Sequence, residues 1–217
     1  MFSAFSMIIF KALMKKLVLA SSSPRRAEVL RNAGIEFEVR PADIDETRRP
    51  DEPAGDYVQR LALEKARAAV NSETGAKDII VIGADTVVVN RGEILLKPDS
   101  PDDARRMLRQ LSSGVHEVHT GLAVIRMPQK IERVVEEVTS VHFAQLSDAE
   151  IDAYIATGEP FDKAGAYGIQ SLGGRYITRV EGCYFNVMGM PLARLWATLK
   201  EFGWSANGPI RQANCCD

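Results

Sequence analysis

The sequence has few cysteines, few histidines and no surplus of either charge. Its 27 basic and 29 acidic residues leave a net charge of −2, without the basic excess typical of nucleic-acid-binding proteins. The three cysteines (Cys183, Cys215 and Cys216) have no metal-ligand spacing, so we expect a reducing compartment and no structural disulfide. The histidines form no HxxxH-type or Cys/His cluster, and a zinc site is therefore not expected.

Long apolar runs are also missing. Residues 1–13 are apolar but interrupted by Lys11, so they cannot span a bilayer. The apolar run at 17–20 has four residues, fewer than the roughly 7–15 that a secretion signal requires. We interpret residues 1–14 as an extension before the folded domain, and we expect a cytoplasmic protein without a membrane partner. The GxxxxGK[S/T] pattern of P-loop NTPases is absent too.

What the chain does contain is an alternation of strand-like and helix-like segments, which favours one α/β domain. At 217 residues it is long enough to bury a substantial core. We expect this domain to span residues 15–203, with a tail at 204–217. Strands are expected at 16–20, 37–39, 79–82, 87–89, 94–96, 117–126 and 133–146. Helices are expected at 24–32, 56–70, 101–113, 147–158 and 191–203.

The segment Ser21-Ser22-Ser23-Pro24-Arg25-Arg26 follows the first expected strand and begins the first helix. Ser23 fits the N-cap and Pro24 the first helical position. Free backbone N–H groups then meet at a helix N-terminus, which favours an anion. Arg25 and Arg26 add two permanent cations. The pattern is as typical of a phosphate site as of a well-capped helix with solvated arginines.

Asp85 is the candidate catalytic carboxylate. It comes directly after the unbroken apolar run 79–82, where a strand is expected to end at Gly83. Open α/β sheets present ligand-binding groups at the ends of their strands. Aspartate is also a common turn former, and the neighbouring Thr86 fits either a turn or a ligand contact.

Two lysines and an acidic loop accompany this aspartate. Lys65 lies on the apolar stripe of the helix expected at 56–70, so it either extends to the rim or meets an anion. Lys97 follows the hairpin that starts at Asp85 and returns to the same end of the sheet, unless it is simply solvated. Glu46 belongs to an acidic loop that either supplies carboxylates to Mg²⁺ or Mn²⁺ or faces solvent.

A glycine-rich segment at 158–170 ends in Gln170. Its glycines imply tight backbone geometry. The Gln170 amide carries both donors and an acceptor, so it is able to read the edge of a nucleobase. Glycine-rich loops have many other uses as well.

Four segments, taken in order, resemble the motifs of the Maf family of nucleoside triphosphate pyrophosphatases. They are 19–26, 83–88, Lys97-Pro98 and 158–170. The resemblance implies hydrolysis between the α and β phosphates, which releases a monophosphate and pyrophosphate. The form Asp-Lys-Ala-Gly-Ala-Tyr-Gly-Ile-Gln is similar to the branch acting on dTTP and UTP. The implied fold is an elongated mixed β-sheet flanked by helices, with a central cleft as in inosine triphosphate pyrophosphatase-like proteins, usually in a homodimer.

The resemblance also implies roles for individual residues. The catalytic positions match Asp85, Lys97, Lys65 and Arg26, and the substrate-binding positions match Ser21, Arg25, Thr86 and Gln170. A divalent cation, Mg²⁺ or Mn²⁺, would be held by Glu46 and Asp85, with Asp43 and Asp45 as rivals of Glu46. The family is described as inhibiting septum formation too, so a nucleotide-binding regulator is an alternative. A phosphatase or nucleotide-dependent transferase that uses the same pocket is another.

Overall fold

The computed structural model describes residues 16–71 and 78–204. Its strands are β1 (Lys16–Leu19), β2 (Glu38–Val39), β3 (Ile79–Asn90), β4 (Glu93–Leu95), β5 (Val115–Arg126), β6 (Ile131–Phe143) and β7 (Ile177–Glu181). Its α-helices are α2 (Pro24–Asn32), α3 (Ala54–Asn71), α4 (Pro101–Leu111), α5 (Asp148–Ile155), α6 (Tyr184–Val187) and α7 (Leu192–Glu201). Three short 3₁₀ helices, η1 (Glu159–Asp162), η2 (Ala164–Ala166) and η3 (Leu172–Tyr176), precede β7.

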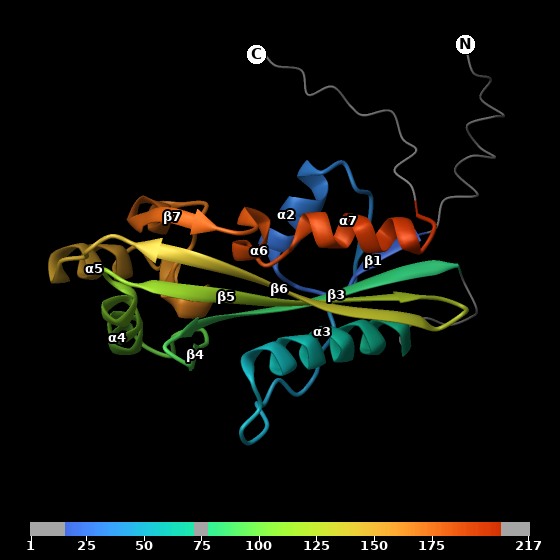
Figure 1. Ribbon diagram of the computed structural model, residues 1–217, viewed down its shortest axis with the longest axis horizontal. Helices are drawn as coiled ribbons and strands as arrows, with labels where there is room; N and C mark the ends of the chain where they lie inside the picture. Colours follow the sequence, from blue (N-terminus) through green and yellow to red (C-terminus); the bar gives the residue numbers. More distant parts are fainter. Residues whose placement is uncertain (1–15, 72–77, 205–217) are drawn as a thin grey trace, which may run out of the picture.

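The strands form one mixed sheet in the order β2-β1-β3-β5-β6-β7. β4 also pairs with β3, further along the same edge that β1 occupies. β1 is parallel to both β2 and β3, and the other pairings in the described sheet are antiparallel. The long strands β3, β5 and β6 run the length of an elongated molecule (Figure 1). The expected α/β class, with a mixed sheet flanked by helices, is confirmed.

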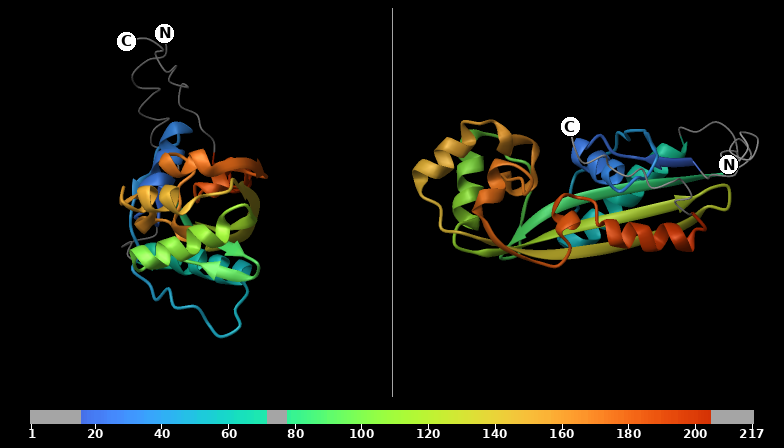
Figure 2. Two further views of the ribbon diagram at one scale, coloured as in Figure 1. Left: turned by 90° about the vertical axis from the view of Figure 1, so that its left-hand side faces the viewer. Right: turned by 90° about the horizontal axis from the view of Figure 1, so that it is seen from above.

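Helices cover the two faces of the sheet at one end and form a separate group at the other. α3 packs on one face, while α2 and α7 pack on the opposite face (Figures 1 and 2). α4 and α5 share a second hydrophobic core with the 3₁₀ segments at the far end. Each end of the sheet therefore has its own core, and the long strands connect them.

The expected break in β3 is wrong. The strand continues through Gly83 to Asn90, and it pairs with β5 as far as Val89. Position 83 lies inside the strand, and it requires a glycine because a Cβ there would come within 2.1 Å of the Ala62 carbonyl oxygen in α3. The glycine thus permits close helix packing rather than a turn. Asp85 consequently lies in the middle of a strand, not beyond its end.

A gap beside β3 locates the functional region. β1 pairs with β3 only as far as Ile82, where the Ala20 N–H donates to the Ile82 carbonyl. β4 begins to pair only at Val88. Between these points, β3 has β5 as its neighbour on one side and no strand of the described sheet on the other. Asp85 and Thr86 lie at this open edge, and they point to opposite faces because side chains alternate along a strand.

The helix start after β1 follows the expectation with one difference. Pro24 is the first residue of α2, and Ser23 occupies the N-cap position in extended backbone. The Ser23 hydroxyl does not cap the helix. Instead, the Ser23 N–H donates to Ser21 Oγ at 3.2 Å, so Ser21 provides the local hydroxyl contact.

The last described residue packs against the folded domain. Trp204, which the sequence places in the tail, is 6% exposed and packs edge-to-face against Trp196 of α7. The expected extension at residues 1–14 and the rest of the tail lie outside the described residues. Within 16–71 and 78–204, no helix combines the length and apolar character needed to cross a bilayer.

Candidate active site

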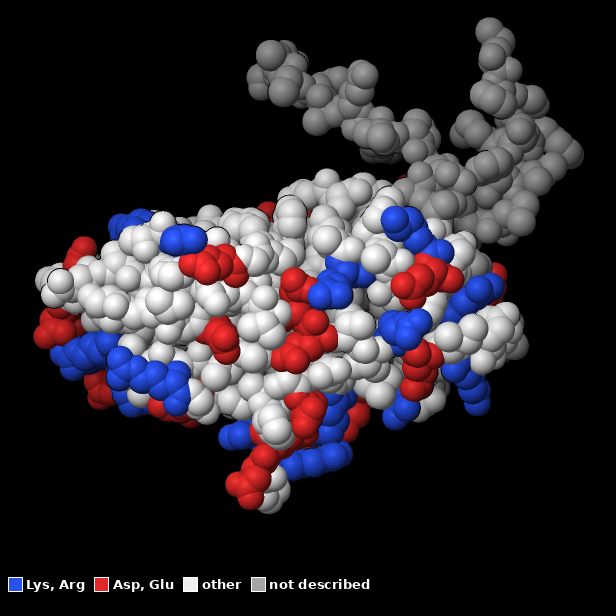
Figure 3. Space-filling view, in the orientation of Figure 1, with Lys and Arg blue, Asp and Glu red and all other residues white. Residues whose placement is uncertain are grey.

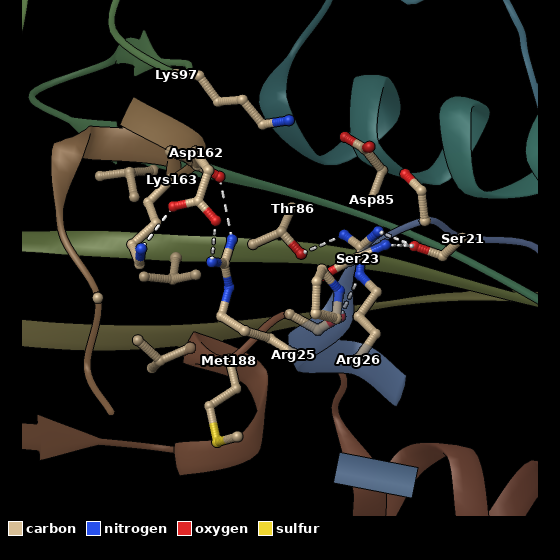
Figure 4. A pocket seen from close by; sticks show the side chains of 18 of the residues that line it. Ser21, Ser23, Arg25, Arg26, Asp85, Thr86, Lys97, Asp162, Lys163 and Met188 are labelled. Atoms are coloured by element: carbon tan, nitrogen blue, oxygen red, sulfur yellow. Dashed lines mark hydrogen bonds and ion pairs between the residues drawn. The ribbon is translucent and has the colours of Figure 1, made fainter. Parts of the chain in front are cut away.

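A cavity of about 880 Å³ opens at the gap beside β3. Its walls come from the β1–α2 turn, α3, the middle of β3, the segment after β4, and residues 162–171 and 187–189. All the candidate site residues line this one cavity: Ser21, Arg25, Arg26, Glu46, Lys65, Asp85, Thr86, Lys97 and Gln170. Figure 4 shows how several of them converge.

Arg26 is a buried cation in the wall of the cavity, at 9% exposure. Its Nε donates to the Gly189 carbonyl at 2.8 Å, one terminal nitrogen to Ser21 Oγ at 3.1 Å and the other to Thr86 Oγ1 at 3.1 Å. Burial lowers the pKa of Arg26, while the charge of Asp85 opposes that shift. No carboxylate among the described residues forms an ion pair with Arg26. A buried cation held only by neutral acceptors is suited to an anionic ligand.

Lys65 meets carboxylates rather than extending to the rim. Its Nζ lies 2.6 Å from Asp85 Oδ1 and 2.7 Å from Glu46 Oε1. The lysine and the aspartate side chains are 10% and 12% exposed, whereas Glu46 is 58% exposed. The helix stripe therefore delivers a cation to the middle of β3, where it orients the Asp85 carboxylate.

The loop that carries Glu46 is attached to α3. The Tyr57 hydroxyl donates to the Glu46 carbonyl at 2.9 Å. Burial, with help from Asp85 and Glu46, raises the pKa of Tyr57 to about 12, so this hydroxyl keeps its proton. Next along α3, Arg60 donates twice to the buried Glu52 carboxylate, at 2.6 and 2.8 Å. Both contacts fix the loop position that puts Glu46 within reach of Lys65.

The opposite wall of the cavity carries Lys97 and Asp162, and Asp162 is bonded by Arg25 and Lys163. Lys97 is exposed and extends toward Asp85 (Figure 4), and it forms no ion pair with any described residue. Arg25 donates to the Asp162 carboxylate at 2.7 Å and to its carbonyl at 3.1 Å. Burial opposes ionisation of Asp162, but bonds from Lys163 and Arg25 outweigh it and lower the pKa. Arg25 thereby connects α2 to η1 across the mouth.

Gln170 lies on the glycine-rich wall, and its neighbours are held by Glu159 and Tyr154. The Glu159 carboxylate accepts from the Tyr154 hydroxyl at 2.8 Å and from the N–H groups of Leu172 and Gly173 at 3.1 and 3.2 Å. The Tyr154 hydroxyl in turn accepts from the Gly168 N–H at 3.2 Å. The backbone is thus anchored on both sides of Gln170.

Sequence reasoning missed three residues: Glu159, which holds the backbone beside Gln170, and Asp162 and Gly189, which line the cavity. The first two fall inside the quoted glycine-rich motif, and their acidic side chains beside tight turns were the available signal. Gly189 contributes through its carbonyl oxygen. Because every residue has a carbonyl, no side-chain pattern could reveal that role.

Comparison with known proteins places this chain in a family. The family model described as Maf-like protein matches residues 16–202. The chain belongs to the Maf-like family. The matched region contains every wall of the cavity, from Ser21 to Gly189.

Relatives of this Maf-like chain cover nearly its whole length. It is 50% identical over 194 residues to a Hahella chejuensis protein named dTTP/UTP pyrophosphatase, a match that covers 88% of this chain and 96% of that one. A Moorella thermoacetica protein of the same name is 49% identical over 197 residues, which covers 91% and 100% of the two chains. Among solved structures, the Staphylococcus aureus Ham1 protein is similar at 15% identity and a TM-score of 0.47, with 87% and 100% of the two chains covered.

Proposed function

We propose that this Maf-like protein hydrolyses dTTP and UTP to the nucleoside monophosphate and pyrophosphate, as a house-cleaning enzyme of the nucleotide pool. The observation that carries the proposal is Arg26, a buried cation without a carboxylate partner among the described residues, in the same cavity as Lys65, Lys97 and Asp85. Such a cavity suits a highly charged polyphosphate. The names of relatives about half identical to this chain support the choice of base.

In the proposed reaction, the triphosphate lies against Arg26, Lys65 and Lys97. Asp85 accepts a proton from a water molecule whose oxygen forms a bond to the α-phosphorus. The bond from that phosphorus to the bridging α–β oxygen breaks, and the electron pair leaves with pyrophosphate. The cations stabilise the negative charge that builds on this leaving group. Lys65 supports the step by holding the Asp85 carboxylate in place.

We further propose that Glu46 and Asp85 hold a divalent cation, Mg²⁺ or Mn²⁺. Their fit is supported by the two carboxylates, which converge on one point, the Lys65 ammonium, at 2.7 and 2.6 Å. The described residues contain no group of three or more metal-ligating side chains. Mg²⁺ is commonly bound through one or two carboxylates and substrate phosphates, so two suffice. The metal would supply Lewis-acid stabilisation of phosphate charge.

We assign the base end of the cavity to Arg25 and Gln170. Both line the cavity, and the anchored backbone beside Gln170 supports a fixed position for its amide. Gln170→Ala is expected to lose discrimination between pyrimidine and purine triphosphates, because a site built around polar edges rejects bases that leave its groups unpaired. Rates on a nucleotide panel measure this ratio. Equal losses on all nucleotides would instead assign Gln170 to general positioning.

The proposed setting is a cytoplasmic homodimer without nucleic-acid or membrane partners. On the face shown in Figure 3, acidic and basic side chains are interspersed, and the chain carries a net charge of −2. Such a surface gives little attraction to a polyanion. Light scattering of the purified protein measures the oligomeric state, and a monomer at working concentration would contradict this part of the proposal.

The decisive experiment is a product assay on purified protein. A panel of standard and modified nucleoside triphosphates is incubated with Mg²⁺ or Mn²⁺, and the products are separated by chromatography. We expect multiple turnovers on dTTP and UTP, with equal amounts of monophosphate and pyrophosphate. Release of orthophosphate would indicate a phosphatase. Tight nucleotide binding without turnover would favour a regulatory protein, such as a regulator of septum formation.

A further inference from the structure

A line of hydrogen bonds connects Arg26 to the C-terminal part of the chain. One terminal nitrogen of Arg26 donates to Thr86 Oγ1 at 3.1 Å, and the Thr86 and Thr120 hydroxyl oxygens lie 2.9 Å apart. Thr120 Oγ1 then lies 3.3 Å from the carbonyl oxygen of Asn186. Thr120 and Asn186 are both fully buried, at 0% exposure. Neither residue lines the cavity.

The two ends of this line determine where its protons lie. A guanidinium only donates and a carbonyl only accepts. The Thr120 proton therefore goes to the Asn186 carbonyl, and the Thr86 proton goes to Thr120 Oγ1. Thr86 Oγ1 is left to accept from Arg26. The Thr86 hydroxyl has a single proton, so none remains for a nucleobase or a phosphate.

Ser21 has the opposite arrangement. Its Oγ accepts from Arg26 at 3.1 Å and from the Ser23 N–H at 3.2 Å. Both lone pairs are then used, and the hydroxyl proton is left to donate. Of the two hydroxyls that hold Arg26, only that of Ser21 has a proton for an anion in the cavity.

The far end of the line is anchored firmly. The Asn186 side-chain nitrogen lies 2.9 Å from the Val118 carbonyl oxygen, 3.1 Å from the Glu137 carbonyl oxygen and 3.1 Å from Thr139 Oγ1, so its two protons serve three acceptors and one proton is shared. These contacts fasten α6 to both β5 and β6. Three residues later, the Gly189 carbonyl accepts from Arg26 Nε. One anchored segment therefore holds Arg26 twice, once directly and once through the two threonines.

We propose that Thr86 and Thr120 are positioning residues for Arg26. Together with Gly189 and Ser21, they engage three of the five N–H groups of the guanidinium and leave two for a phosphate group. The inference rests on the proposed function, in which Arg26 binds the triphosphate. The family resemblance gives Thr86 a substrate-binding position and gives Thr120 no role.

The test uses two variants that remove a hydroxyl at nearly constant volume. Thr120→Val removes the hydroxyl that lies between Thr86 and the Asn186 carbonyl, and Thr86→Val removes the hydroxyl that contacts Arg26 directly. Two assays are run on each variant: binding of inorganic tripolyphosphate by calorimetry, and kcat/KM for dTTP, UTP and CTP. We expect each variant to bind tripolyphosphate about tenfold more weakly, because an Arg26 guanidinium that is no longer held in place aligns less well with the phosphate oxygens. For Thr120→Val we expect kcat/KM to fall by a similar factor on every nucleotide, with unchanged ratios between nucleotides.

Three comparisons separate positioning from general destabilisation. Thr120→Ser keeps the hydroxyl and is expected to restore binding. The double variant is expected to lose little more than either single variant, because both break the same line. Thr198→Val is the matched control: this buried threonine bonds the Arg194 carbonyl within α7, away from the cavity. It is expected to bind tripolyphosphate as the wild type does.

The proposal is overturned if Thr120→Val binds tripolyphosphate like the wild type. It is also overturned if Thr120→Val changes the ratio of dTTP to CTP turnover, because Thr120 would then act on the base rather than through Arg26. Should Thr120→Val fail to fold, Thr86→Val still tests the line, since Thr86 is only partly buried. A wild-type protein without pyrophosphatase activity would refute the proposed function, while the calorimetry would still test the line.

Discussion

Single residues in the cavity differ sharply in how they are held. Arg26 is buried against neutral acceptors, Lys65 lies between two carboxylates, and Lys97 faces the cavity without an ion pair to any described residue. These three cations have the same charge but different freedom to move. Their predicted responses to substitution therefore differ as well.

Asp85→Asn is expected to abolish turnover while nucleotide binding is largely retained. Asparagine keeps the shape of the side chain but accepts no proton, so the attacking water loses its base. Single-turnover product formation and calorimetric titration with a nonhydrolysable dTTP analogue measure the two properties separately. Retention of most of the activity would remove Asp85 from the mechanism.

Lys65→Met is expected to strengthen Mn²⁺ binding several-fold in the absence of nucleotide. The Lys65 ammonium bonds to both carboxylates that would hold the metal, so its removal leaves them free for another cation. Electron paramagnetic resonance of free Mn²⁺ measures the affinity. Lys97→Met is the matched control, because it removes a cation of the same cavity that does not bridge the carboxylates. Equal effects of both variants would indicate a general charge effect and contradict the prediction.

At the scale of elements, the close approach of α3 to the sheet sets the site geometry. A Cβ on Gly83 would lie 2.1 Å from the Ala62 carbonyl, and one on Gly121 would lie 2.1 Å from the Val58 carbonyl. Gly121 is paired directly with Asp85. The missing side chains let α3 lie low enough for Lys65 to reach Asp85.

Gly121→Ala is therefore expected to lower both stability and activity. The added methyl group must push α3 away from the sheet, and overpacking of this kind costs about 1–3 kcal/mol or more. Urea denaturation measures the free energy of unfolding. The loss of activity that results from a displaced Lys65 is measured as kcat/KM at a temperature where the variant is folded. Gly92→Ala is a control without a clash, since its Cβ meets nothing within 4 Å and only a positive φ of 83° opposes it. If Gly121→Ala and the control lose equal stability, close packing is not the cause.

At the scale of the whole molecule, the two ends of the sheet have separate cores and share one cavity. The far-end core contains His116, which is 2% exposed and lies 2.8 Å from the Tyr167 hydroxyl. Tyr167 also lines the cavity. Burial, with a smaller contribution from His142, lowers the pKa of His116 to about 4. Tyr167 therefore connects this core to the wall that carries Gln170.

Acid is expected to destabilise the fold through this histidine. Between pH 6.5 and about 4, the unfolded chain binds a proton at His116 that the folded protein does not. The free energy of unfolding then falls as pH decreases, by at most about 1.4 kcal/mol per pH unit. His116→Gln does not titrate, so urea denaturation of the variant at pH 7, 6 and 5 is expected to give a shallower decline than the wild type. Parallel declines would exclude His116 as the source.

The sequence alone determined the order of elements from β1 to α5 and the last helix, α7, because periodicity and helix-start residues act locally, but it did not predict the 3₁₀ helices, β7 or α6. It placed the start of α2 at Pro24, put Lys65 on the buried stripe of α3, and nominated cavity residues through four local motifs. It could not determine that β3 continues through Gly83, since a glycine that admits a helix backbone looks the same as one that makes a turn.

Only the tertiary structure decided which partners these residues meet. The Gly189 carbonyl and the Thr120 hydroxyl reach Arg26 from chain segments far away in sequence, the second through Thr86. The gap beside β3 exists because β1 ends before β4 begins. Such contacts depend on sheet register and helix packing. These are properties of the assembled fold, and no local pattern encodes them.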